Sequence, residues 1–126
     1  MISGIDHVVL TVRDIKASAA FYGDILGMRV EKFANDRVAV HFGSQKINLQ
    51  TLGQETRNKA GIGSGDLCLV SGRTIDEIAA HLTAKGVDII EGPVSKTGAC
   101  GPITSFYFND LDQNLIEISS YERPLS

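Results

Sequence analysis

Residues 5–30, IDHVVLTVRDIKASAAFYGDILGMRV, decide the fold. The β-branched run Ile5–Val12 predicts a strand, and Asp14 is a residue type that caps a helix. Apolar residues between Ile15 and Leu26 recur at helical spacing, and Gly27 is a residue that commonly ends a helix. The first half of the chain is therefore predicted to be a βαβββ module, whose last three strands are expected at 28–33, 37–42 and 45–51.

The same order of elements returns in the second half. The interval between Gly27 and Gly86 equals the interval between His7 and Asp66 in the two leading strands, which indicates an internal duplication. The second module is predicted to have strands at 66–71, 87–91, 103–109 and 114–119, a helix from Thr74 to Lys85, and a long loop at 92–102. We therefore predict one α+β domain over residues 1–126, in which modules 4–52 and 65–121, joined by a linker at 53–64, form an open, cup-shaped mixed sheet.

Composition and charge exclude several classes of protein. The 126 residues are 43% hydrophobic and 21% charged, which is ordinary for a globular protein. The net charge is −3 and basic residues are scattered, which disfavours binding to nucleic acid. No apolar stretch reaches the ~20 residues that span a bilayer, and the first residues lack the features of a signal peptide. Because Cys68 and Cys100 are too few for a disulfide scaffold, we expect a cytoplasmic protein.

Each module places polar side chains on one face of its strands. Successive strand residues point to opposite faces, so His7 faces away from Leu10, and Gln50 faces away from Leu49. Under the duplication, His7 corresponds to Asp66 and Gln50 corresponds to Glu117. A single polar strand residue usually only faces solvent, but four groups that can bind a metal at matched positions favour a site.

These residues resemble the vicinal oxygen chelate superfamily, which includes glyoxalase I, bleomycin-resistance and fosfomycin-resistance proteins and extradiol dioxygenases. The similar motifs are IDHVVLTVRD at 5–14, FYGDILGMRV at 21–30 and FNDLDQNLIEI at 108–118. The chain looks most similar to single-domain glyoxalase-like proteins of the glyoxalase-domain-containing protein 5 type, which include bacterial virulence-associated members. The resemblance implies one divalent metal ion with four ligands, namely His7, Gln50, Asp66 and Glu117.

Departures from the family pattern narrow the chemistry. Asp66 stands where the family often has histidine, and Gln50 stands where histidine or glutamate is common. With only His7 available, the two-histidine, one-carboxylate iron site of the dioxygenases is disfavoured. The two carboxylates balance a divalent cation, and oxygen-rich ligation favours Mn, Mg, Ni or Co over a thiolate-type zinc site, although the sequence does not distinguish among these ions and Zn.

The resemblance implies a lyase or isomerase of the lactoylglutathione-lyase type that acts on a small oxygenated metabolite. In such enzymes the metal acts as a Lewis acid, and a carboxylate removes the proton next to a carbonyl. Glu117 is the implied base, and we expect Tyr107, Asn48 and Thr11 to contact the substrate. Recognition of glutathione is not supported, because Thr11 stands where glyoxalase I typically has an arginine, so a glutathione hemithioacetal is one substrate option among several. The resemblance also implies a homodimer with sites at its interface.

Two other functions stay open. A metal-free member would bind a small ligand or drug, as bleomycin-resistance proteins do, and metal content would separate it from an enzyme. A fosfomycin-type thiol transferase would need a basic cluster for a phosphonate, and the candidate residues Arg37, Lys46 and Lys96 are scattered along the chain.

Overall fold

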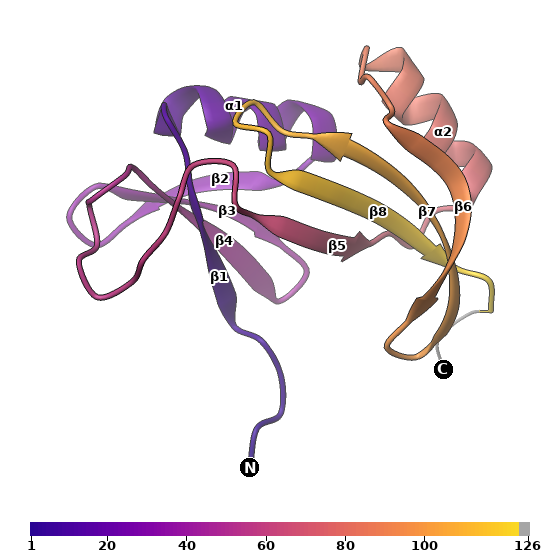
Figure 1. Cartoon of the computed structure of the whole chain (residues 1–126), viewed down its shortest axis with the longest axis horizontal. Coiled ribbons are helices and arrows are strands. Elements are labelled where there is room, and N and C mark those ends of the chain that lie inside the picture. The colour runs from indigo at the N-terminus through magenta and orange to yellow at the C-terminus, as the bar shows by residue number, and fades with distance from the viewer. Residues whose placement is uncertain (124–126) are drawn as a thin grey trace. The chain divides into compact units, whose positions relative to one another are not determined.

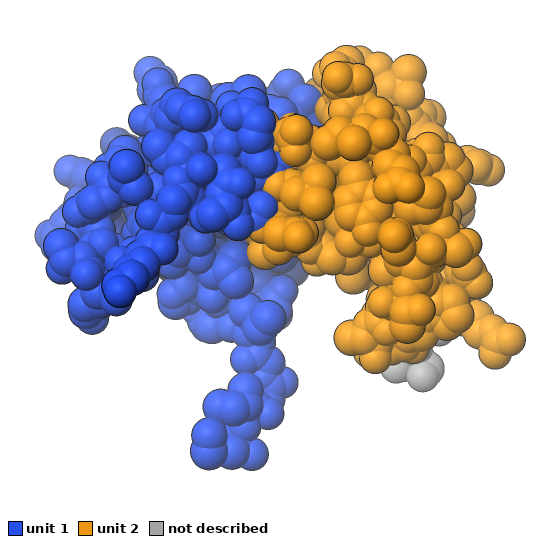
Figure 2. All heavy atoms as spheres, viewed as in Figure 1, with its two compact units in different colours: residues 1–65, 111–114 blue, residues 66–110, 115–126 orange. Residues whose placement is uncertain are grey.

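The computed structural model describes residues 1–123 and contains two four-stranded sheets, each with one helix (Figure 1). The chain divides into two compact units, coloured separately in Figure 2. The first unit comprises residues 1–65 and 111–114. The second comprises residues 66–110 and 115–126, of which the structure describes those up to Arg123. Both units follow the order βαβββ, so the predicted α+β class and the duplicated module are confirmed.

The first unit is built on a sheet of order β1-β4-β3-β2, in which only the β1–β4 pair is parallel. Helix α1 begins after Asp14, whose side chain accepts a hydrogen bond from the backbone N–H of Ala17 at 3.0 Å. It ends at Gly27, which has a left-handed φ of 67°. Tyr22 of the helix is fully buried, and the core of this unit also includes Ile47. The elements are β1 (His7–Thr11), α1 (Ile15–Leu26), β2 (Arg29–Phe33), β3 (Arg37–Phe42) and β4 (Gln45–Gln50).

The second unit repeats this plan with a sheet of order β5-β8-β7-β6, in which only β5 and β8 are parallel. Thr74 and Glu77 cap α2 reciprocally, each side chain accepting a hydrogen bond from the other residue's backbone N–H at 3.2 Å. Helix α2 buries Leu82, and the sheet buries Phe108 and Ile116. The elements are β5 (Asp66–Val70), α2 (Ile75–Ala84), β6 (Glu91–Gly98), β7 (Gly101–Asn109) and β8 (Leu115–Tyr121).

Strand β6 overturns two predictions. Residues 87–90 form no strand, and β6 occupies most of the predicted loop at 92–102. The register between β6 and β7 shifts between Glu91 and Val94, so Gly92 and Pro93 lie in a bulge. Gly92 has a φ of 131°, and a Cβ there would lie 2.6 Å from the backbone oxygen of Ser105. Glycine and proline therefore mark an irregular edge strand here, where no further strand needs the N–H that proline lacks.

No helix in residues 1–123 is long and apolar enough to cross a membrane.

Candidate functional site

The register of the sheets corrects one predicted correspondence. In the first sheet, His7 lies opposite Lys46 and Val9 lies opposite Asn48. In the second sheet, Asp66 lies opposite Leu115 and Cys68 lies opposite Glu117. The residue two places beyond the partner of Asp66 is Glu117, and the residue two places beyond the partner of His7 is Asn48. The predicted match of Gln50 with Glu117 is therefore wrong, because the position equivalent to Glu117 is Asn48.

Gln50 lies opposite Thr11, and the two side chains bind each other. The Gln50 Nε2 atom donates a hydrogen bond to Thr11 Oγ1 at 2.8 Å, and both residues are buried. The residue opposite His7 is Lys46, and Gln50 lies four residues further along β4. At ~3.3 Å per residue, this separates Gln50 from the level of His7 by about 13 Å along the strand. Within this sheet, His7 and Gln50 therefore do not converge on one ion.

Asn48 is buried with an unsatisfied oxygen. Its exposed fraction is 3%, and its Oδ1 atom has no hydrogen-bond partner among residues 1–123. Leaving a buried acceptor without a partner costs about 1–3 kcal/mol, and such an atom in a folded protein calls for an explanation. It lies on the same face of the sheet as His7. A cation or a ligand hydroxyl at this place would supply the missing partner.

His7 is oriented by its neighbour in the sequence. Its Nδ1 atom lies 2.7 Å from Asp6 Oδ1, and this hydrogen bond, followed by the charge of the imidazole, lowers the pKa of Asp6. Metal-binding histidines characteristically use one ring nitrogen for the ion and the other for a carboxylate or carbonyl. The Asp6 contact thus leaves His7 Nε2 as the nitrogen suited to a ligand. The sequence reasoning did not consider Asp6, although it directly precedes His7.

Two buried serines orient Glu117 in the second sheet. Glu117 Oε2 accepts a hydrogen bond from Ser105 Oγ at 2.6 Å, and Ser119 Oγ lies 3.3 Å away. The two serine oxygens are 2.7 Å apart, and both residues are fully buried. These contacts hold the carboxylate in one orientation. Sequence reasoning missed Ser105, whose only signal was that it shares a strand face with Tyr107.

Cys68 and Tyr107 flank Glu117 on the two neighbouring strands. Burial raises the pKa of Cys68, and the negative charges of Glu117 and Asp66 add to this effect. Desolvation, followed by the contact with Glu117, raises the pKa of Tyr107. Both groups therefore stay protonated at neutral pH beside the carboxylate, and Cys68 Sγ lies 3.1 Å from Ser119 Oγ. Asp66 is exposed on the same face, two residues before Cys68.

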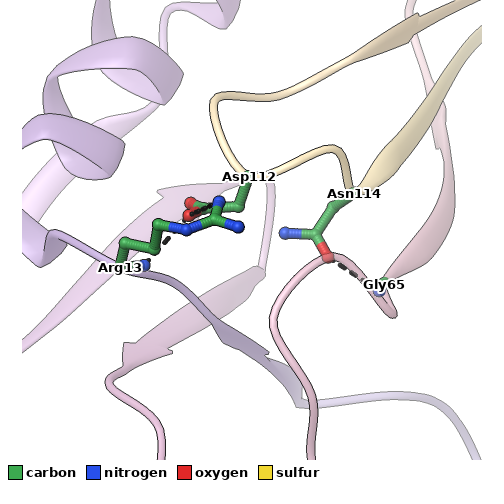
Figure 3. A network of polar contacts seen from close by, with 4 residues as sticks. All are labelled: Arg13, Gly65, Asp112 and Asn114. Atoms are coloured by element: carbon green, nitrogen blue, oxygen red, sulfur yellow. Dashed lines mark hydrogen bonds and ion pairs between the residues drawn. The ribbon is translucent and has the colours of Figure 1, made fainter.

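Residues 111–114, the last four of the motif DLDQN, have a structural role in the first unit (Figure 3). Asp112 Oδ1 accepts hydrogen bonds from the backbone N–H of Arg13 at 3.0 Å and from its Nη1 atom at 3.2 Å. The Asn114 side-chain oxygen accepts a hydrogen bond from the backbone N–H of Gly65 at 2.7 Å. Asp112 and Asn114 are both buried, so these bonds hold residues 111–114 within the first unit, one against the segment after β1 and one against the segment before β5.

Replacement of Asp112 by alanine is expected to destabilise the protein by about 2 kcal/mol, because two hydrogen bonds to a buried carboxylate are lost. Urea unfolding followed by circular dichroism measures the change. Leu111→Ala is the matched control, since Leu111 lies in the same hairpin with 52% of its surface exposed, and it should change stability by less than about 0.5 kcal/mol. Equal midpoints for the two variants would contradict this role of Asp112.

Two further side chains that could bind a metal or react, His41 and Cys100, have other surroundings. His41 Nε2 lies 3.4 Å from Glu31 Oε2. Cys100 lies exposed in the turn between β6 and β7, and its backbone N–H donates to the Tyr121 hydroxyl at 3.0 Å. Among residues 1–123, no group of three or more His, Cys, Asp or Glu side chains is arranged to hold a metal. Asn48 is not of these types, and it is the buried group on the His7 face that lacks a partner.

Residues 4–118 match the family model described as the Glyoxalase/Bleomycin resistance protein/Dioxygenase superfamily. The chain belongs to this family.

Its relatives carry general names. Virulence protein STM3117 of Salmonella typhimurium is 44% identical over 96% of this chain and 86% of its own length. Glyoxalase domain-containing protein RDO1 of Mycosarcoma maydis is 46% identical over 96% of this chain and 70% of its own. An integron cassette protein from the mobile metagenome of V. cholerae is 47% identical, and its structure matches with a TM-score of 0.91 over 97% of this chain and 98% of the other.

More distant structures share the fold alone. A lactoylglutathione lyase from Agrobacterium tumefaciens matches with a TM-score of 0.76 at 21% identity, over 95% of each chain. The fosfomycin resistance protein FosX from Listeria monocytogenes, in complex with Mn(II) and sulfate, matches with a TM-score of 0.66 at 22% identity, over 95% of this chain and 91% of its own.

Proposed function

We propose that the protein is a metal-dependent lyase or isomerase of the glyoxalase type, which removes a proton next to a carbonyl of a small oxygenated metabolite. The observation that carries this proposal is the matched pair of polar positions on the two sheets. His7 and Asn48 in one sheet correspond to Asp66 and Glu117 in the other. Asn48 presents an unsatisfied buried oxygen, and Glu117 is held by two buried serines.

The ligands in this proposal are His7, Asn48, Asp66 and Glu117, with Asn48 in the place first predicted for Gln50. One imidazole nitrogen, one amide oxygen and two carboxylates form a donor set that suits a divalent ion such as Mn, Mg, Ni, Co or Zn. The unsatisfied Oδ1 of Asn48 fits such an ion, because coordination would replace the missing hydrogen bond. When bound, the ion supplies Lewis acidity to a substrate oxygen.

The residues of the chain supply the proton transfer. Glu117 is the proposed base, and Ser105 and Ser119 keep its carboxylate directed. Tyr107 lies beside Glu117 and remains the proposed substrate contact of the second sheet. Thr11 is a weaker substrate contact than the sequence indicated, because it already accepts a hydrogen bond from Gln50. A homodimeric, cytoplasmic protein completes the proposal.

Metal content tests this proposal. We expect the purified, tag-free protein, after incubation with Ni, Co, Mn or Zn and removal of free ions, to retain close to one ion per chain by elemental mass spectrometry. Glu117→Ala should lose most of the metal, whereas Glu122→Ala, which removes a carboxylate from an exposed position outside the strands, should keep it. If neither protein retains metal, the enzyme proposal fails and a metal-free protein that binds a small ligand becomes the better description.

A further inference from the structure

Two cations converge on one aromatic ring in the first unit. The Arg37 Cζ atom lies 4.8 Å from the centroid of the Phe33 ring, and the Lys46 Nζ atom lies 3.8 Å from the same centroid. The three residues come from strands β3, β2 and β4, respectively. We call Phe33, Arg37 and Lys46 the basic cluster. The third cation weighed from the sequence, Lys96, lies in the second unit, 5.8 Å from the Tyr107 ring centroid.

The basic cluster lies on the face of the sheet that carries Asn48. Asn48 is opposite Ala39. On the same face, Lys46 lies in the next row of paired residues on one side of this pair, and Phe33 lies in the next row on the other side. The contact between Lys46 and Phe33 therefore passes over the Ala39–Asn48 row. Ala39 has no exposed surface, and Asn48 has 3%. The cluster and Asn48, whose Oδ1 atom lacks a partner, thus share one face of the sheet in neighbouring rows.

Neither cation of the cluster has an ion-pair partner within residues 1–123. Two acidic side chains of this unit have other partners: Glu31 binds Arg29 at 2.8 Å and also faces His41. Asp6 binds His7 and is affected by Lys46 only through its charge. The guanidinium of Arg37 lies over the Phe33 ring. A guanidinium can also bind two oxygens of an anion side by side, and within residues 1–123 no carboxylate pairs with this one.

We propose that the basic cluster binds the oxyanion of a small ligand, a carboxylate or a phosphonate, and that the oxygenated end of the same ligand extends to Asn48. The proposal deepens the function proposed above, on which it rests, by naming an anionic substrate class. Arg37 supplies a bidentate edge and Lys46 supplies a point charge, while the Phe33 ring keeps both cations on one side of the sheet.

Binding of simple anions to the metal-free protein tests the cluster without relying on the metal. Inorganic phosphate, methylphosphonate and acetate are titrated separately into EDTA-treated protein, and backbone amide shifts are followed by nuclear magnetic resonance. We expect shifts in β2, β3 and β4, with saturation below about 10 mM for at least one probe. Tighter binding of acetate would assign a carboxylate ligand, and tighter binding of methylphosphonate would assign a phosphonate.

Arg37→Gln and Lys46→Met should each weaken this binding about tenfold or more. Lys32→Met is the matched control, because it removes the same charge from an exposed position on the other face of β2, and it should leave binding within twofold. Phe33→Leu should also weaken binding, since it releases both cations without changing the charge. No saturation by any probe, or equal affinities in Arg37→Gln, Lys46→Met and the wild type, overturns the proposal.

Metal content measured on the same proteins keeps the two proposals apart. Arg37→Gln and Lys46→Met should retain metal, because neither residue is a proposed ligand. If the protein binds metal but no anion, only the proposal for the basic cluster is contradicted. If the protein binds an anion but no metal, the proposed metal-dependent enzyme is contradicted, and the basic cluster stands as a binding site.

Discussion

The Asn48→Ala variant is expected to bind divalent metal at least about tenfold more weakly than the wild type, whereas Gln50→Ala keeps wild-type affinity. Alanine removes the unsatisfied buried oxygen that lies at the position equivalent to Glu117. Loss of groups that only support ligands already costs about 10–100-fold in affinity, so loss of a ligand should cost at least as much. Titration with Ni or Mn against a chromophoric chelator measures both variants.

Gln50→Ala supplies the internal control for stability. It leaves Thr11 without its hydrogen bond at 2.8 Å and should lower the free energy of unfolding by about 1 kcal/mol, with no effect on metal. Asn48→Asp should bind metal at least as tightly as the wild type, because a carboxylate replaces the amide oxygen. If Gln50→Ala loses metal and Asn48→Ala retains it, Gln50 and not Asn48 is the ligand, although Asn48 holds the position equivalent to Glu117.

The module order was predictable because its signals are local. Asp14 and Gly27 mark the ends of α1, and Thr74 marks the start of α2, where the structure places the caps. Strand β6 was not predictable in this way. Gly92 and Pro93 are typical of loops, and only pairing with β7 turns them into a bulge in an edge strand.

The sequence predicted which face of each strand carries the candidate site residues, but not which positions along the strands lie opposite one another. Alternation along a strand placed His7, Asn48 and Gln50 on one face, as the structure has them. The choice between Asn48 and Gln50 depends on the register between β1 and β4. These parallel strands are joined through a helix and two further strands, so no local signal sets their alignment. The basic cluster was hidden for the same reason, since contact between Phe33 and Lys46 crosses two strand pairings.

Glu117→Gln is expected to lower turnover by about 10²–10⁴-fold, the range that a positioned general base contributes. The amide keeps the shape of the side chain and an oxygen that can accept the hydrogen bond of Ser105, so the sheet should be preserved. Turnover is measured with hemithioacetals formed from an α-oxoaldehyde and several thiols, at metal concentrations that saturate each variant. Saturation with metal is essential, because Glu117 is proposed as both ligand and base.

Glu117→Asp and Ser105→Ala separate the two roles of this carboxylate. Aspartate keeps the charge but is one methylene shorter, which moves the carboxylate away from Ser105 and Ser119. Metal affinity should therefore fall by a smaller factor than the turnover rate does. Ser105→Ala leaves the base in place but removes its closest hydrogen bond, at 2.6 Å, and should reduce turnover less than Glu117→Gln does. If Glu117→Gln keeps more than about a tenth of the wild-type rate when saturated with metal, Glu117 is not the base, and the proton is removed by another group near the ion.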